Sequence, residues 1–152
     1  MSLAFFQDCL RRENLGESIK PYESGEIAKT AEGAAQAIGC DVAQIAKSLI
    51  VSVEGRYYVF LVPGNERLNF GLISSVLPGE ARMANADEVK DVTGYSIGGI
   101  PPFGHKSKLK TYIIPGFPQD KPLYAAAGDK AQTFEISYVD LVRLTGADEF
   151  NV

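Results

Sequence analysis

Histidine and cysteine are scarce in this chain, which holds one histidine, His105, and two cysteines, Cys9 and Cys40. Two cysteines are too few for the disulfide framework of a small secreted protein. A zinc site uses several clustered ligands, which one histidine and two distant cysteines do not supply. The sequence therefore predicts a protein without a metal ion.

The motifs of several enzyme classes are also missing. The chain has no phosphate-binding loop with a trailing lysine, and no dinucleotide fingerprint follows its first expected strand. It has no Gly-x-Ser-x-Gly nucleophile elbow, and a serine triad would depend on His105 as its base. We therefore expect no cofactor, and we disfavour a serine hydrolase.

Long apolar runs and an excess of positive charge are absent as well. No stretch approaches the ~20 apolar residues that span a bilayer, and no signal peptide is visible at the start. We expect a cytoplasmic protein that does not contact a membrane. The net charge of −4 argues against a protein that grips DNA or long RNA through phosphates, but it allows contact with one RNA end.

The composition that remains is that of a globular protein. The 152 residues are 45% hydrophobic and 22% charged, which suits a single domain spanning 1–152. Periodicity and capping residues predict helices at 3–13, 30–39, 41–47, 69–76, 85–92 and 137–146. Apolar runs and turn residues predict strands at 18–23, 48–53, 56–62, 111–114, 123–126 and 132–136. Helices interrupt the strands irregularly, which predicts an α+β fold with a mixed sheet.

Lys47 is the first candidate functional residue. The sequence predicts that it lies at the end of a short helix, just before the buried strand 48–53. One interpretation is a solvated lysine whose charge meets the negative end of the helix dipole. The other is a cation at the mouth of a pocket, where it holds a carbonyl or phosphate oxygen. The residues alone leave both interpretations open.

The segment 94–104 is the second candidate, with four glycines and two prolines in eleven residues. Glycine and proline impose special backbone geometry, so the segment predicts a shaped loop. It is either a chain reversal between a helix and a strand, or a loop whose backbone N–H groups converge on an oxyanion. Its length and glycine content exceed what a reversal requires.

A cluster of cations follows this loop. Lys106, Lys108 and Lys110 alternate directly after His105, which predicts three lysines on one face of a strand. Lysines commonly protect the exposed edge of a sheet. They also form patches that bind RNA phosphates. The residues favour neither interpretation.

Two segments of the chain, Ile45–Val51 and Thr93–Gly104, strongly resemble the YbaK family. This family also occurs as the editing domain inserted in bacterial prolyl-tRNA synthetases. The specific feature is a lysine before a strand, Lys47, paired with a later Gly-x-x-x-Pro loop, here Gly98 to Pro102. The resemblance covers nearly the whole chain. It implies an α+β fold with a mixed, partly barrel-like sheet flanked by helices.

The resemblance implies a trans-acting deacylase that cleaves the ester bond of a mischarged tRNA. In the family, the lysine and the loop line a pocket for the aminoacylated 3′ end of tRNA. Water cleaves the ester without a metal, and the terminal ribose hydroxyl assists. The expected amino acid is small: alanine, serine, threonine or cysteine. An aminoacyl-tRNA synthetase is a further expected partner.

The expected roles of single residues follow from the resemblance and from the loop and cation cluster described above. The catalytic residues expected are Lys47, Gly98, Gly99 and Ile100. The substrate-binding residues expected are Tyr22, Thr30, Ser48, Pro101, Pro102, Phe103 and Gly104. The RNA contacts expected are His105, Lys106 and Lys108. Ala126 and Thr133 stand where members acting on cysteinyl-tRNA tend to have serine and aspartate.

Two other classes of function remain open at this point. A non-catalytic module would keep the pocket but bind a tRNA or a synthetase for regulation. A generic pocket protein would bind a small ligand. The presence of Lys47 favours an enzyme, because a binding module has no need of it. A deacylation assay on a panel of mischarged tRNAs discriminates between these functions.

Overall fold

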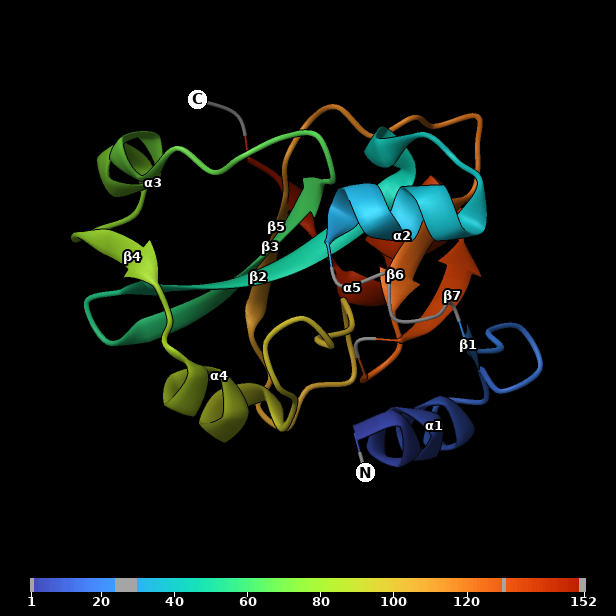
Figure 1. Cartoon of the computed structure of the whole chain (residues 1–152). Helices are drawn as coiled ribbons and strands as arrows, with labels where there is room; N and C mark the ends of the chain where they lie inside the picture. Colours follow the sequence, from blue (N-terminus) through green and yellow to red (C-terminus); the bar gives the residue numbers. More distant parts are fainter. Residues whose placement is uncertain (1, 24–29, 130, 151–152) are drawn as a thin grey trace.

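A mixed sheet of eight strands forms the centre of the computed structural model, which describes residues 2–23, 30–129 and 131–150 (Figure 1). The strands are β1 (Tyr22–Glu23), β2 (Ile45–Val53), β3 (Arg56–Pro63), β4 (Ala81–Met83), β5 (Lys110–Ile113), β6 (Leu123–Ala126), β7 (Gln132–Ile136) and β8 (Asp148–Glu149). The helices are α1 (Ser2–Arg12), α2 (Ala31–Ile38), α3 (Phe70–Val76), α4 (Ala86–Thr93) and α5 (Tyr138–Thr145), with a 3-10 helix η2 (Val42–Gln44). The predicted α+β fold with a mixed sheet is confirmed.

The strand order in the sheet is β1-β7-β6-β2-β3-β5-β8, and β4 pairs with β2 off this path. Hairpin neighbours run antiparallel, whereas β2 runs parallel to β6 and β3 runs parallel to β5. The short β1 lies at one end of this order, as Pro21 predicts for an edge strand. No helix in the described ranges is long and apolar enough to cross a membrane.

The hairpin of β2 and β3 sets the register of the central sheet. Its two-residue turn, Glu54 and Gly55, has φ of 49° and 81°, as the tight turns of hairpins require. Hydrogen-bonded pairs alternate along an antiparallel ladder, beginning with Val53↔Arg56 beside this turn. The even-numbered residues of β2 therefore direct their backbone N–H and C=O groups away from β3. The Ile50 carbonyl indeed accepts a hydrogen bond from outside the hairpin, at 3.0 Å.

The outer edge of β2 is paired at both of its ends but not in its middle. Ile45 and Ala46 pair with β6, and Val51 to Val53 pair with β4. In the described part of the chain, no strand lies beside positions 47–50 on this edge. The longest strand of the sheet thus carries a gap in its ladder, and the site described below opens at this gap.

Capping residues begin and end the helices as the sequence predicts. The Thr30 hydroxyl accepts a hydrogen bond from the first turn of α2, and Gly39 ends this helix with φ of 85°. Asn85 and Glu88 form the reciprocal capping box of α4. Ser137 caps α5 in the same way as Thr30 caps α2. Local hydrogen bonding therefore explains these boundaries.

The predicted helix 41–47 is wrong. The Asp41–Gln44 capping box is present, but it begins only the short η2, and β2 starts at Ile45. Lys47 therefore lies inside a strand, paired with Val62 of β3, and not at a helix end. Pairing of β2 with β3 and β6 outweighs the local helix signal, because tertiary contacts override weak propensity.

The predicted strand carrying three alternating lysines is also wrong. Lys106 and Lys108 lie in an irregular segment, and β5 begins only at Lys110. The N–H groups of Lys106 and Ser107 each donate to a carbonyl in the last turn of α4, at 3.0 Å. These bonds satisfy the backbone at a helix end, so the segment has no need of a strand partner.

Alternate side chains of β2 and β3 enter two different apolar cores, as the period of a strand requires. Ile50 packs in a core with Phe6 of α1, which is fully buried. Val51 and Phe60 pack in a second core with Ile73 of α3. Figure 1 shows α1 and α3 at opposite ends of the molecule. The candidate site lies on the α1 side of β2.

Candidate active site

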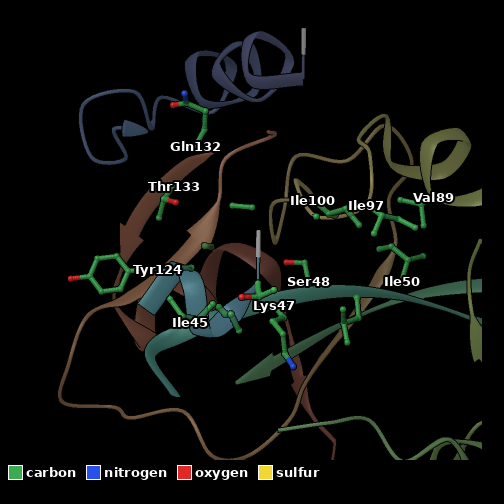
Figure 2. Close-up of a pocket in the computed structure, with 18 of the residues that line it drawn as sticks. Ile45, Lys47, Ser48, Ile50, Val89, Ile97, Ile100, Tyr124, Gln132 and Thr133 are labelled. Carbon is green, nitrogen blue, oxygen red and sulfur yellow. The ribbon is translucent and has the colours of Figure 1, made fainter. Parts of the chain in front are cut away.

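A cavity of about 320 Å³ opens at the gap in the outer edge of β2 (Figure 2). Its walls come from β2, α2, β6 and β7, the end of β4, α4, and the loop after α4. Most lining side chains are small or branched and apolar. The lining residues are Thr30, Ala31, Ala34, Ile38, Ile45, Ala46, Lys47, Ser48, Leu49, Ile50, Met83, Ala84, Val89, Ile97, Gly98, Ile100, Tyr124, Ala125, Ala126, Gln132 and Thr133.

Ser48 lies in the middle of the unpaired stretch of β2. Its hydroxyl oxygen is buried and has no hydrogen-bond partner among the described residues. Its backbone N–H and C=O point away from β3, and the ladder with β6 already ends at Ala46. A buried polar group without a partner costs about 1–3 kcal/mol. Ser48 is therefore the place in an apolar wall where a ligand's hydrogen-bonding group gains most.

Lys47 lines the same cavity, but its ammonium extends to the other side of β2 from the Ser48 side chain (Figure 2). The Lys47 Nζ donates to the Glu66 carbonyl at 2.8 Å. Burial lowers the pKa of Lys47, and the nearby Glu32 carboxylate opposes this by raising it. A lysine ammonium carries more donors than this one bond uses. Lys47 is thus a half-buried cation on a strand that lines the cavity, and its ammonium has donors that this bond does not use.

The glycine-rich loop contributes Gly98 and Ile100 to the cavity wall. Gly98 has φ of 93°, a conformation that favours glycine. The Gly99 N–H donates to the Ser96 carbonyl at 3.0 Å and so closes a turn. The amides of Gly98 and Ile100 make no such bond to the described backbone. Of the three amides expected to serve as oxyanion donors, those of Gly98 and Ile100 thus have no acceptor in the described backbone, and Gly99 has a separate structural role.

That role is close packing. A Cβ atom at Gly99 would lie 2.9 Å from the Gly128 carbonyl oxygen and 2.9 Å from the Asp129 Cα, both in the turn between β6 and β7. The Asp129 carboxylate in turn accepts a hydrogen bond from the Leu3 N–H at the start of α1, at 3.1 Å. The loop is thus pressed against a turn that α1 holds in place.

Helix α1 also packs against the far part of the loop. The Phe6 and Phe103 rings lie 5.5 Å apart between centroids. A Cβ atom at Gly104 would lie 3.0 Å from the Cys9 Sγ, and Gly104 has φ of 83°. These contacts hold the part of the loop that does not line the cavity.

The structure brings together only part of the predicted site. Lys47, Ser48, Thr30, Gly98 and Ile100 all line the cavity. Tyr22 does not line it: this residue pairs with Thr133 in the sheet, and its side chain is 41% exposed. Pro101 is buried but lines neither this cavity nor the next. Gly99 also lines neither cavity. The other predicted residues line a second cavity on the other part of the loop, and they are Pro102, Phe103, Gly104, His105, Lys106 and Lys108.

His105 is engaged inside the protein. Its Nε2 donates to the Pro101 carbonyl at 2.7 Å, and burial lowers the pKa of the ring below its ordinary value. A neutral imidazole with this partner is not a cation for a phosphate. Within the described ranges, no group of three or more His, Cys, Asp or Glu side chains is placed to hold a metal ion.

Several wall residues escaped the sequence reasoning. Gln132 of β7 and Tyr124 of β6 reach the cavity only because β6 pairs in parallel with the start of β2. No local sequence pattern predicts that β2 pairs with β6, because these strands lie far apart in the chain. The one available signal was the family resemblance, which singled out Ala126 and Thr133, and both line the cavity.

Comparison with known proteins places this geometry in a family. A model described as the aminoacyl-tRNA editing domain matches residues 26–144. This chain belongs to the aminoacyl-tRNA editing domain family. The matched range includes β2, the gap at Ser48 and the glycine-rich loop, whereas α1 precedes it.

Relatives of this editing domain include free-standing proteins and parts of larger ones. The chain is 27% identical over 142 residues to the uncharacterized protein YwhH of Bacillus subtilis, covering 93% of this chain and 89% of that protein. It is 25% identical over 139 residues to a proline–tRNA ligase of Bacillus licheniformis, covering 88% of this chain but only 24% of the ligase. A crystal structure of a proposed trans-editing enzyme for prolyl-tRNA synthetase matches with a TM-score of 0.91 and 35% identity, covering 99% and 95% of the two chains.

Proposed function

We propose that this editing domain is a trans-acting deacylase that hydrolyses the ester bond of a tRNA mischarged with a small amino acid. The observation that carries the proposal is the cavity at the gap in β2. There Lys47 and Ser48 of β2, the latter with an unpaired hydroxyl, and Gly98 and Ile100 of the loop line one cavity in a member of the editing family. Such a protein acts where charged tRNA is used, in the cytoplasm, with the tRNA 3′ end as partner and a synthetase as a second partner.

The size of the cavity supports a small amino acid. Its volume of about 320 Å³ has to receive an aminoacyl group together with part of the terminal ribose. Ile45, Ile50 and Ile100 narrow the space with branched side chains that bring no polar atoms. A methyl or hydroxymethyl side chain suits such walls, whereas a large side chain has to displace them, which overpacks the site.

The polar groups are arranged for ester hydrolysis. As water attacks the ester carbonyl, negative charge develops on its oxygen, and donors aimed at that oxygen stabilise the transition state. The amides of Gly98 and Ile100 supply such donors. Lys47 holds the carbonyl or a neighbouring phosphate, and the Ser48 hydroxyl gains a partner from the substrate. We assign the proton transfers to water and to the ribose hydroxyl, because the described residues of the cavity wall include no histidine or carboxylate.

A deacylation panel tests the proposal. The protein is incubated with tRNAs charged with alanine, serine, threonine, cysteine and, as a large control, phenylalanine. We expect hydrolysis of at least one small aminoacyl ester well above the spontaneous rate and none of the phenylalanyl ester. Binding of these tRNAs without faster hydrolysis of any of them would overturn the proposal and favour a non-catalytic regulatory module.

A further inference from the structure

A second cavity, of about 580 Å³, lies where the end of α1, the segment 102–109 and the end of α5 meet. Among the described residues, its wall contains four cations from three separate parts of the chain and one carboxylate, Glu13. The cations are Arg12, Lys106, Lys108 and Arg143. The whole chain has 15 basic and 19 acidic residues, so this local excess of positive charge runs against its overall balance.

We propose that this second cavity binds phosphates of the RNA backbone next to the charged 3′ end, with Arg12 and Arg143 acting together with Lys106 and Lys108. The inference rests on the proposed function for the identity of the RNA. It extends the RNA contact beyond the lysines that the sequence pointed to, and it replaces His105, whose ring is already bonded to Pro101.

The construction of the cavity supports this role. Backbone bonds from Lys106 and Ser107 to the last turn of α4 fix the segment, so the lysine side chains extend from a rigid support. All four cations are solvent-exposed, as groups that meet a phosphate from solution need to be. Arg143 forms an ion pair with Asp140, at 3.0 Å. Both side chains are exposed to solvent, so this ion pair is weak.

The position of the cavity supports RNA rather than a free anion. Gly98 lines the first cavity and Lys106 lines the second, and a fully extended chain between them spans at most about 28 Å. One loop thus holds both sites within the reach of a few nucleotides. We therefore infer that a strand whose terminal ester enters the first cavity reaches the second with its neighbouring phosphates.

The double variant Arg12→Gln/Arg143→Gln tests the inference by direct binding. The probe is a deacylated RNA minihelix with a single-stranded 3′ end, followed by fluorescence anisotropy at several salt concentrations. We expect the dissociation constant to rise roughly tenfold, and the slope of log K against log salt to fall by about two, because two phosphate contacts are lost. Arg56→Gln, at the exposed start of β3, is the matched control and should change neither quantity.

Kinetics separate the failure of this inference from the failure of the proposed function. On an aminoacylated minihelix, the double variant should raise KM about tenfold with a much smaller change in kcat, since the lost contacts are remote from the ester. An unchanged dissociation constant and KM, in a wild-type protein that hydrolyses the ester, would overturn the inference alone. Absence of hydrolysis by the wild type would overturn the proposed function, while the binding experiment still decides the inference.

Inorganic phosphate distinguishes a backbone site from a pocket for a free anion. Titration calorimetry with phosphate should show no saturable binding at millimolar concentrations in either protein. Saturable phosphate binding that the double variant loses, with unchanged affinity for the minihelix, would overturn the inference. Circular dichroism of the variant confirms that the substitutions leave the fold intact.

Discussion

The two cavities on either side of the loop 98–108 differ in almost every physical property. The first is lined mainly by small and branched apolar side chains, and Lys47, the one cation among its described lining residues, is half-buried and bonded to a backbone carbonyl. The second is lined by four exposed cations. Charges near water attract a polyanion from a distance but contribute little precision, whereas donors in an apolar wall act only on a group that fits. We infer that the start of the loop, at the first cavity, serves the chemical step, and that its end, at the second cavity, binds the RNA.

Gly99→Val is expected to have the largest effect, and it tests whether the two ends of the loop have separate roles. The new side chain would collide with the β6–β7 turn, where even a Cβ atom has 2.9 Å to its neighbours, so the loop and its amides would have to move. We expect kcat to fall by at least about 10³-fold, beyond the loss of a single oxyanion donor. Binding of the deacylated minihelix should change much less.

Gly16→Val is the matched control for this variant, because a Cβ atom at Gly16 meets nothing within 4 Å. It should keep both activity and fold. Circular dichroism and thermal unfolding of both variants exclude a general loss of structure. Normal turnover by folded Gly99→Val would show that the position of the loop does not matter for hydrolysis.

The next effect in size is expected from Lys47→Ala. Removing this cation should lower kcat/KM by about 10²-fold or more, a loss comparable to that of an oxyanion donor. Folding should change little, because the ammonium bonds only to the Glu66 carbonyl among the described residues. Lys20→Ala, an exposed lysine outside both cavities, serves as the control. A Lys47→Ala protein with near wild-type rates would remove Lys47 from the mechanism.

The pH dependence of hydrolysis is a second test of the role of Lys47. Burial lowers the pKa of Lys47, so its charge is lost at a lower pH than that of a free lysine. Because the charged form is the active one, activity should decline on the alkaline side as pH rises through this lowered pKa. Lys47→Arg should keep its charge and shift the decline to higher pH. An identical alkaline limb in both proteins would assign the decline to another group.

A smaller effect is expected from Asp129→Ala, which removes the acceptor for the Leu3 N–H at the start of α1. Loss of such a partner should lower the free energy of unfolding by about 1 kcal/mol and, by loosening the turn behind Gly99, lower kcat several-fold. Asp129→Asn keeps an acceptor oxygen and should recover most of both. Chemical denaturation and single-turnover kinetics measure the two effects. Equal loss of kcat in the Asn variant would point to the charge of Asp129 and not to its hydrogen bond.

The smallest effect should come from chelation. We expect EDTA to leave hydrolysis of a pre-folded minihelix unchanged, because the described residues of the two cavity walls offer no set of metal ligands. The minihelix avoids the separate need of a full tRNA for magnesium. Activity that is lost in EDTA and restored by a divalent ion would contradict this.

The helix caps and the hairpin turn were predictable from the sequence, whereas long-range pairing was not. The caps at Thr30, Asn85 and Ser137 and the Glu54-Gly55 turn were predicted correctly, since each depends on residues a few positions apart. The strands β4 and β8 were missed, because they are short and exist only through their partners. Lys47 was picked out by the resemblance even though its local structure was assigned wrongly.

The gap in the ladder at Ser48 was also not predictable from the sequence. It depends on where two independent ladders, with β6 and with β4, come to an end, and no pattern within β2 encodes this. Likewise, Arg12 and Arg143 lie at the ends of helices from opposite termini of the chain. Only the folded structure shows that they face the lysines across one cavity.

The unpaired middle of β2 has a consequence for experiments in solution. Amides inside a paired strand exchange their hydrogen with solvent deuterium slowly, because exchange waits for local opening. The Ser48 amide lies in the longest strand, yet it has no ladder partner among the described residues, so it should exchange faster than the amides on either side of it. A molecule bound in the first cavity would slow this one exchange rate. Ser48 thus provides a single-residue reporter of occupancy that depends neither on catalysis nor on knowing which amino acid the substrate carries.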